Sequence, residues 1–261
     1  MFENANFTNN TMVLCERSGK NADMLMDIRA VLLKAGESIK IYSDTDENAA
    51  MLLQGEVDFV CDERTLHGKR ANPFDKSPYA VHTSKGVAFE VVAIADSEII
   101  IQSTNNENTF PTEYYTPDNV LYQEFGKEQW NGAGYRVVST LFDNDNAPLS
   151  NMVLGEVYNQ PGCWSSYPPH SHPQPEVYYY RFDKPQGFGA CFNGDDVYKS
   201  TDRSFSTIRN GQCHQQVVGP GYTMYYVWMI RHLDGDTWYK TTRNVPPEHQ
   251  WMLKEDWSKV K

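Results

Sequence analysis

Residues 164–182, WSSYPPHSHPQPEVYYYRF, decide the expected fold because they place two histidines and a glutamate beside an aromatic run typical of a β-strand. On a strand, side chains two residues apart point to the same face, so His170 and His172 are expected to face one pocket. Glu176 follows four residues after His172 and can return to that pocket. Three ligands of one metal ion are therefore expected from one strand and its turn.

An HxH pair without further support is more often an exposed polar loop behind a proline turn than a pair of ligands. Here a carboxylate follows the pair, and His214 offers a fourth imidazole just before a later strand. Imidazole nitrogen and carboxylate oxygen suit zinc, nickel, iron and manganese, so we expect one such divalent ion per chain. The other histidines lack such neighbours and are expected to be surface or structural residues: His67, His82, His232 and His249.

Charge and composition narrow the classes of partner. The 261 residues carry a formal net charge of −11, which argues against nucleic acid or an anionic membrane, since both need surplus Lys and Arg at the contact. No apolar run is long enough to span a bilayer, and the N-terminus MFENANFTNN lacks the features of an export signal. The five cysteines form no CxxC pair. We therefore expect a cytoplasmic protein with reduced cysteines.

Short apolar or alternating runs recur between Gly, Asp and Asn turn signals, for example SIKIY, YAVHT and EIIIQS. This pattern predicts an all-β chain built as a sandwich or barrel, with short helical turns only in a stretch such as residues 116–132. The two halves read alike, so we expect two copies of one β-unit, residues 1–125 and 126–261. The counterpart of the HSH motif in the first half falls near Ile41, Tyr42 and Ser43, where no histidine occurs. The first unit is therefore expected to lack a metal site.

Several stretches of the second half resemble one known family. His170, His172 and Glu176 with the distant His214 are similar to the two-part cupin signature. EVYNQPGCWSSYPPHSH, EVYYYRF, PGYTMYYVWMI and the terminal PPEHQW together resemble the 5-deoxy-glucuronate isomerases of myo-inositol catabolism, from about residue 132 to 251. The resemblance implies a bicupin, two packed jelly-roll β-barrel domains, with the metal carried by those four residues of the second barrel.

The chain departs from that family's pattern beside the metal motif. The family usually reads PPHKH, whereas Ser171 replaces the lysine here, and the insert before the glutamate is cut to residues 173–175. After the glycine turn the chain reads GFGACFNGDDVY, without the Gln-Arg pair common in the family. These differences are expected to affect contacts with a sugar-acid substrate more than they affect the fold.

An aldose to ketose isomerisation moves a proton between adjacent carbons, and a divalent metal stabilises the negative charge that grows on oxygen. Candidates for the base that moves the proton are Glu156, Tyr178 and Tyr180. Alternatively, Glu156 is a solvated strand residue and the two tyrosines belong to the barrel core. The carboxylate of the substrate would pair well with a guanidinium, and Arg136 and Arg181 are the candidates. Either arginine could instead be a surface ion-pair partner.

These observations together predict a metal-dependent isomerase of a small anionic deoxy-uronic acid. Open sheet edges favour self-association into a homo-oligomer. Two alternatives stay open: a cupin that binds a sugar acid without catalysis, and a related uronate ketol-isomerase or metal dioxygenase.

Overall fold

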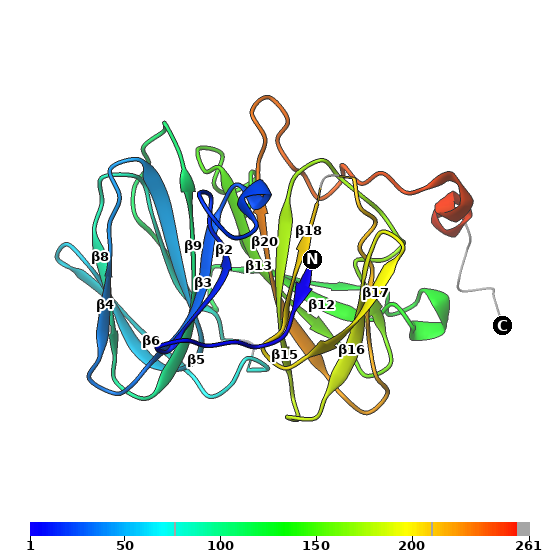
Figure 1. Cartoon of the computed structure of the whole chain (residues 1–261), viewed down its shortest axis with the longest axis horizontal. Helices are drawn as coiled ribbons and strands as arrows, with labels where there is room; N and C mark the ends of the chain where they lie inside the picture. The colour runs from blue at the N-terminus through cyan, green and yellow to red at the C-terminus, as the bar shows by residue number, and fades with distance from the viewer. Residues whose placement is uncertain (76, 210, 255–261) are drawn as a thin grey trace. The chain divides into compact units, whose positions relative to one another are not determined.

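The computed structural model describes residues 1–75, 77–209 and 211–254, and its regular structure is almost entirely β (Figure 1). Helical structure in these ranges consists of short 3-10 turns, η1 (Ala22–Met24), η2 (Trp130–Gly132) and η3 (Pro247–Leu253). None of the helices described has the length and apolar character needed to cross a membrane. The all-β fold expected from the strand pattern is confirmed.

The chain forms two compact units that exchange short segments. The N-terminal unit comprises Asn6–Val120 and Leu141–Met152, and the C-terminal unit comprises Met1–Ala5, Leu121–Thr140 and the chain from Val153 onward. The first residues join the C-terminal unit because β1 (Phe2–Glu3) pairs with β18 (Phe205–Ile208). This division differs from a single boundary at residue 125, because strand pairing overrides order along the chain.

The N-terminal unit is built around one long strand, β5 (Asp46–Cys61), which pairs with β7 and β9 along its first part and with β6 and β8 along its second. Its register shifts between Leu52 and Gln54, where the strand passes from one set of partners to the other. Inward-facing apolar side chains such as Val31, Phe59 and Ile101 form the core. The other strands are β2 (Thr11–Cys15), β3 (Asp27–Leu33), β4 (Ser38–Ile41), β6 (Arg64–Arg70), β7 (Tyr79–Thr83), β8 (Phe89–Ala93), β9 (Ser97–Asn105) and β10 (Glu113–Tyr115).

The C-terminal unit has a seven-stranded sheet in the order β1-β18-β15-β20-β13-β12-β11 and a four-stranded sheet in the order β14-β19-β16-β17. Its core draws side chains from both sheets, for example Tyr180 and Tyr226 from the first and Cys191 and Val218 from the second. The strands are β11 (Leu121–Phe125), β12 (Arg136–Phe142), β13 (Met152–Asn159), β14 (Trp164–Ser165), β15 (Glu176–Phe182), β16 (Phe188–Asn193), β17 (Asp196–Thr201), β19 (Gln216–Val218) and β20 (Met224–Arg231).

Residues 116–132 were the best candidate for helix, and most of that expectation is wrong. Leu121–Phe125 instead forms β11, which pairs with β12 from Leu121 opposite Thr140 to Phe125 opposite Arg136. Only the short turn η2 follows. Pairing with a neighbouring strand decides the backbone here, as is usual for a segment without a strong helical period.

A buried carboxylate holds the returning segment 141–152 in the N-terminal unit. Glu47 accepts hydrogen bonds from the Ser150 hydroxyl at 2.7 Å and from the Asn151 amide at 2.6 Å. Its Oε2 also lies 3.0 Å from Nε2 of His82, and both side chains are fully buried. The ring of His82 stacks on Phe142 at 4.1 Å, so this histidine is structural, as its isolation in the sequence suggested.

Replacing Glu47 with Ala should lower the free energy of unfolding by about 3 kcal/mol, because it leaves several buried donors without a partner. Urea denaturation followed by circular dichroism measures this change. The matched control is Glu107→Ala. The Glu107 side chain is 96% exposed in its ion pair with Lys85, so its replacement should change the free energy of unfolding only slightly. Equal effects of the two substitutions would contradict the anchoring role of Glu47.

Candidate metal centre

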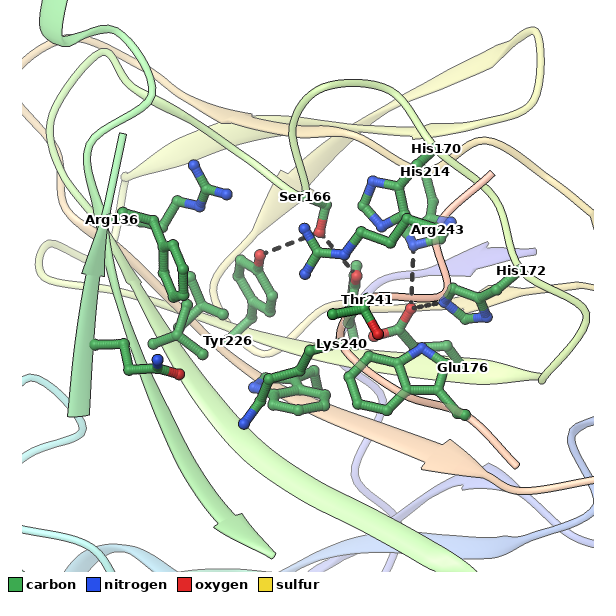
Figure 2. A pocket seen from close by; sticks show the side chains of 17 residues that line it. Arg136, Ser166, His170, His172, Glu176, His214, Tyr226, Lys240, Thr241 and Arg243 are labelled. Carbon is green, nitrogen blue, oxygen red and sulfur yellow. Dashed lines mark hydrogen bonds and ion pairs between the residues drawn. The ribbon is translucent and has the colours of Figure 1, made fainter. Parts of the chain in front are cut away.

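Three ligand-type side chains of the C-terminal unit converge in its interior. Nε2 of His172 and Nε2 of His214 each lie 3.2 Å from the same oxygen, Oε2 of Glu176. Figure 2 shows the two imidazoles approaching this carboxylate from different directions. One potential ligand atom from each residue lies within 4.8 Å of the others, and all three residues are buried. The arrangement has the donor set and the size of a site for one metal ion.

Hydrogen bonds at the far side of each ring decide which nitrogen faces this cluster. Nδ1 of His170 lies 2.9 Å from the Pro168 carbonyl, and Nδ1 of His172 lies 2.9 Å from the Gln174 carbonyl. Nδ1 of His214 lies 2.9 Å from the carbonyl of Gln212. A carbonyl oxygen can only accept, so Nδ1 carries the proton in each ring and the neutral imidazole presents an Nε2 lone pair.

This tautomer makes the short contacts to Glu176 informative. Nε2 of His214 is buried and has no hydrogen-bond partner in the described structure, although it lies beside a carboxylate oxygen. Two lone pairs that face each other repel unless a cation lies between them. The residues present therefore fit a bound divalent ion, and the cluster needs either that ion or protons on the imidazoles.

His170 lies next to this group. Its ring centroid is 4.7 Å from that of His214 and 6.3 Å from that of His172. Burial, followed by the nearby His214, lowers the pKa of His170 well below its usual value. The ring therefore stays neutral at physiological pH, as a metal ligand must. The structure brings three of the four predicted ligands into one cluster and places His170 beside it.

Local backbone structure orients the side chains of the two histidines of the HSH motif. The motif lies in a loop ahead of β15, so the strand expected for His170 and His172 is wrong. Ser171 nevertheless forms an isolated β-bridge with Asn244, through N–H to carbonyl hydrogen bonds of 3.0 and 2.9 Å. The bridge gives the loop the alternation of a strand, so the histidines on either side of Ser171 point the same way.

Glu176 is the first residue of β15, which lies between β18 and β20 in the seven-stranded sheet. Burial on its own raises the pKa of this carboxyl group, but the side chains of His172 and His214, each 3.2 Å away, outweigh it and hold the pKa below its usual range. Glu176 is therefore a carboxylate at neutral pH, which suits a cation.

A pocket of about 310 Å³ opens onto this cluster, and we call it the histidine pocket. Its charged lining residues, apart from Glu176 and the histidines, are all cations: Arg136, Lys240 and Arg243. Its polar and apolar walls include Gln123, Phe125, Val138, Val157, Ser166, Tyr178, Tyr226, Trp228, Trp238 and Thr241. The pocket thus combines a buried metal-type donor set with an excess of positive charge, in a chain that is acidic as a whole.

Besides the four predicted metal ligands, two of the predicted catalytic and substrate-binding residues lie in the histidine pocket. The Tyr178 hydroxyl is 2.9 Å from Oγ of Ser166, and burial raises its pKa well above the usual value. The guanidinium of Arg136 donates to the carbonyls of Gly134 at 2.9 Å and Tyr167 at 3.3 Å. Burial lowers the pKa of Arg136 to about 10, so it remains a cation at neutral pH. In Figure 2, Arg136 and the histidine cluster occupy opposite sides of the pocket.

The structure does not bring Glu156, Tyr180 or Arg181 to the histidine pocket. Glu156 follows the strand alternation onto the other face of β13, where it accepts hydrogen bonds from Tyr158 at 2.8 Å and Tyr225 at 2.6 Å. Tyr180 faces the core, with its hydroxyl 2.7 Å from Ser206. Arg181 forms an ion pair with Asp202 at 2.9 Å. Tyr180 and Arg181 have the structural roles that the sequence left open, a barrel-core tyrosine and an ion-pair partner. Glu156 is buried, so its alternative, a solvated strand residue, is wrong as well.

Sequence reasoning missed the segment that completes the pocket. Trp238, Lys240, Thr241 and Arg243 follow β20, and no motif marks them. The Trp238 amide donates to Nδ1 of His232 at 3.1 Å, which gives that histidine a structural role. The one available signal was the basic and aromatic run TWYKTTR, which lies shortly before the PPEHQW stretch.

Comparisons with known proteins show the family and the fold type of this chain. The chain matches the KduI/IolB family over residues 1–252. It is 27% identical over 257 residues to a 5-deoxy-glucuronate isomerase of Bacillus licheniformis, with 90% of each chain covered. A crystal structure of an IolB-like protein from Salmonella typhimurium LT2 matches with a TM-score of 0.79 and 24% identity, over 87% of this chain and 90% of that one.

A cupin 2 conserved barrel domain protein from Leptotrichia buccalis also matches, with a TM-score of 0.53 and 11% identity, over 85% of this chain and 88% of that one. The structural matches show that the fold is of the cupin type, as the HSH motif and its flanking strands had suggested. The family match covers nearly the whole chain, so this protein belongs to the KduI/IolB family.

Proposed function

We propose that this chain is a metal-dependent aldose-ketose isomerase that acts on a deoxy-uronic acid of the 5-deoxy-glucuronate type. The observation that carries the proposal is the histidine pocket, which has a buried His/Glu/His group at one side and three cationic side chains around it. A metal ion held by the His/Glu/His group would suit the carbonyl and hydroxyl oxygens of the substrate, and the cationic side chains would suit the substrate carboxylate. Relatives named 5-deoxy-glucuronate isomerase across nearly the full length support the same reaction.

The metal would be held by His170, His172, Glu176 and His214, a donor set that suits zinc, nickel, manganese or iron. When bound, a divalent ion supplies Lewis-acid stabilisation of the negative charge that develops on the substrate oxygens. The protein's own part is to orient the three histidines through their Nδ1 hydrogen bonds and to present Glu176 at the start of β15.

Arg136 is the best-placed group for one end of the substrate. A guanidinium has five N–H donors, and the Gly134 and Tyr167 carbonyls use only two of those on Arg136. The carbonyls and the Phe125 ring, 5.4 Å from the guanidinium carbon, fix its plane. The remaining donors can accept a carboxylate with a defined orientation.

Lys240 and Arg243 provide further positive charge in the histidine pocket. The related isomerases usually have a lysine between the two histidines, whereas this chain has Ser171 there. Because the Ser171–Asn244 bridge holds the backbone next to Arg243 against the HSH loop, the C-terminal segment can supply the charge that Ser171 lacks.

Tyr178 fits the role of a proton donor better than that of a base. Its raised pKa keeps the hydroxyl protonated at neutral pH, and the hydroxyl lies in the histidine pocket beside Ser166. A buried phenol can donate a hydrogen bond to an oxygen on which negative charge develops. This assignment replaces the expectation that Tyr178 or Tyr180 removes the substrate proton.

The reaction itself is tested by incubating the metal-loaded protein in D₂O with a panel of uronic and deoxyuronic acids. We expect exchange of the proton at C2 and formation of the ketose with at least one acid, followed by NMR. Binding without exchange would indicate a non-catalytic sugar-acid protein, and oxygen uptake would indicate a dioxygenase. Either result in place of exchange overturns the proposed reaction.

Replacing His214 with Ala should remove most of the bound metal and of the turnover, because it deletes a ligand that lies 3.2 Å from Glu176. Elemental analysis of the purified protein and the exchange assay measure the two effects. His67→Ala is the control, since that side chain is 54% exposed in the N-terminal unit. Chelator treatment of the wild type should reproduce the loss, and re-addition of metal should reverse it. Full activity in a metal-free preparation would exclude the metal-dependent reaction.

Replacing Arg243 with Gln should raise KM for the acid about tenfold with little change in kcat, because it removes an ionic contact of roughly 1.4 kcal/mol made equally before and during the reaction. Steady-state kinetics measure both constants. Lys199→Gln, which removes the same charge from β17 outside the pocket, is the control. A loss confined to kcat would contradict this prediction, because it would mean that Arg243 acts only in the transition state.

A further inference from the structure

The N-terminal unit also has a cavity at the end of its barrel, with a volume of about 440 Å³. We call it the N-terminal cavity. It is lined by Val13, Cys15, Glu16, Ser18, Asp27, Ile28, Arg29, Lys40, Ile41, Tyr42, Ser43, Asp46, Asn48, Ile101 and Ser103. The lining includes Ile41, Tyr42 and Ser43, the positions that the sequence pattern placed opposite the HSH motif.

Strand pairing shows that the N-terminal cavity is the counterpart of the histidine pocket. β5 lies between β7 and β9, as β15 lies between β18 and β20, and all these pairs are antiparallel. Asp46 is the first residue of β5, as Glu176 is the first residue of β15. The same place in the two barrels therefore carries a carboxylate.

The cation beside this second carboxylate is a guanidinium. Arg17 donates to Oδ1 of Asp46 at 3.0 Å and to Oδ2 at 2.6 Å. The same guanidinium bonds Oδ2 of Asp27 at 2.9 and 2.7 Å. Because Arg17 bonds both carboxylates at fixed geometry, they are largely neutralised without any ligand.

Arg29 is left as the cation of the N-terminal cavity that has no partner. Its Nε is shielded from solvent and makes no hydrogen bond, and among the described residues no ion pair or hydrogen bond to its guanidinium is found. Arg29 as a whole is half-buried, so the unsatisfied group is this one N–H, which has lost its hydration without gaining a partner. An anion in the cavity would satisfy it.

The other polar groups indicate what kind of anion fits. The Ser43 oxygen accepts from the Thr45 and Asp46 amides, and its O–H has only a long contact of 3.4 Å with the Thr45 hydroxyl, which a better acceptor can replace. The Ser103 hydroxyl donates to Asn48 at 2.7 Å, so its oxygen can still accept. Glu16 also lines the cavity, and its carboxylate disfavours a doubly charged ligand such as phosphate. These groups suit a monocarboxylate that carries hydroxyl groups.

We propose that the N-terminal cavity is a second binding site, which takes a small hydroxycarboxylate with its carboxylate on Arg29 and its hydroxyls on Ser43 and Ser103. The role assigned to the site is binding. The proposal does not depend on the reaction proposed for the histidine pocket.

Isothermal titration of the full-length metal-loaded protein with D-glucuronate tests the site. We expect two binding events per chain in the wild type when the histidine pocket also binds the acid. Arg29→Gln should abolish the binding event of the N-terminal cavity and leave the metal content of the protein unchanged. The histidine pocket contributes the same heat to both proteins, so their difference reports the N-terminal cavity whether or not the first pocket is an isomerase.

Arg29→Lys keeps the charge and the aliphatic stem but loses the planar fork, so it should fold like the wild type and bind at least tenfold more weakly at this site. Lys69→Gln, which removes a charge from an exposed ion pair of the same unit, is the control and should bind like the wild type. D-Glucose, which lacks the carboxylate, should give no Arg29-dependent heat.

The proposal is overturned if the isotherms of Arg29→Lys and the wild type coincide. It is also overturned if inorganic phosphate binds the Arg29-dependent site more tightly than D-glucuronate does, because the ligand would then be a different class of anion.

Discussion

The site of this protein depends on hydrogen bonds between histidine Nδ1 atoms and backbone carbonyls. Each of the three bonds, at 2.9 Å, fixes a tautomer and directs an Nε2 lone pair inward. Without them, a neutral imidazole could turn or protonate the wrong nitrogen, and the contacts with Glu176 would become ordinary hydrogen bonds. The carbonyls belong to residues two positions away from each histidine, so the loops themselves hold their ligands.

The barrel and the C-terminal segment position the other groups of the site. β15 carries Glu176 at the centre of a sheet, where its neighbours on both sides restrain it. The Ser171–Asn244 bridge joins the metal loop to the segment that bears Lys240 and Arg243. One pair of backbone hydrogen bonds thus links the groups suited to a metal with those suited to a carboxylate. Any movement of the segment would change both.

The two barrels show how one architecture supports different chemistry. Each places a carboxylate at the start of its central strand, Asp46 in one and Glu176 in the other. In the first, Arg17 supplies a fixed positive charge, whereas in the second the imidazoles leave room for an exchangeable ion. A guanidinium cannot act as a Lewis acid, so this difference separates a site suited to binding from one suited to catalysis.

The sequence by itself determined the all-β class, the resemblance to the isomerase family and the four clustered residues, because strand alternation and an HxH motif are local patterns. Only the tertiary structure decided which further side chains share the pocket. Alternation alone could not say which face of β13 is the pocket, so Glu156 was misplaced, and Arg181 was taken up by Asp202. Lys240 and Arg243 line the same pocket as the histidines, and the bridge that joins their segment to the HSH loop connects residues 171 and 244, too far apart along the chain for any local pattern to reveal.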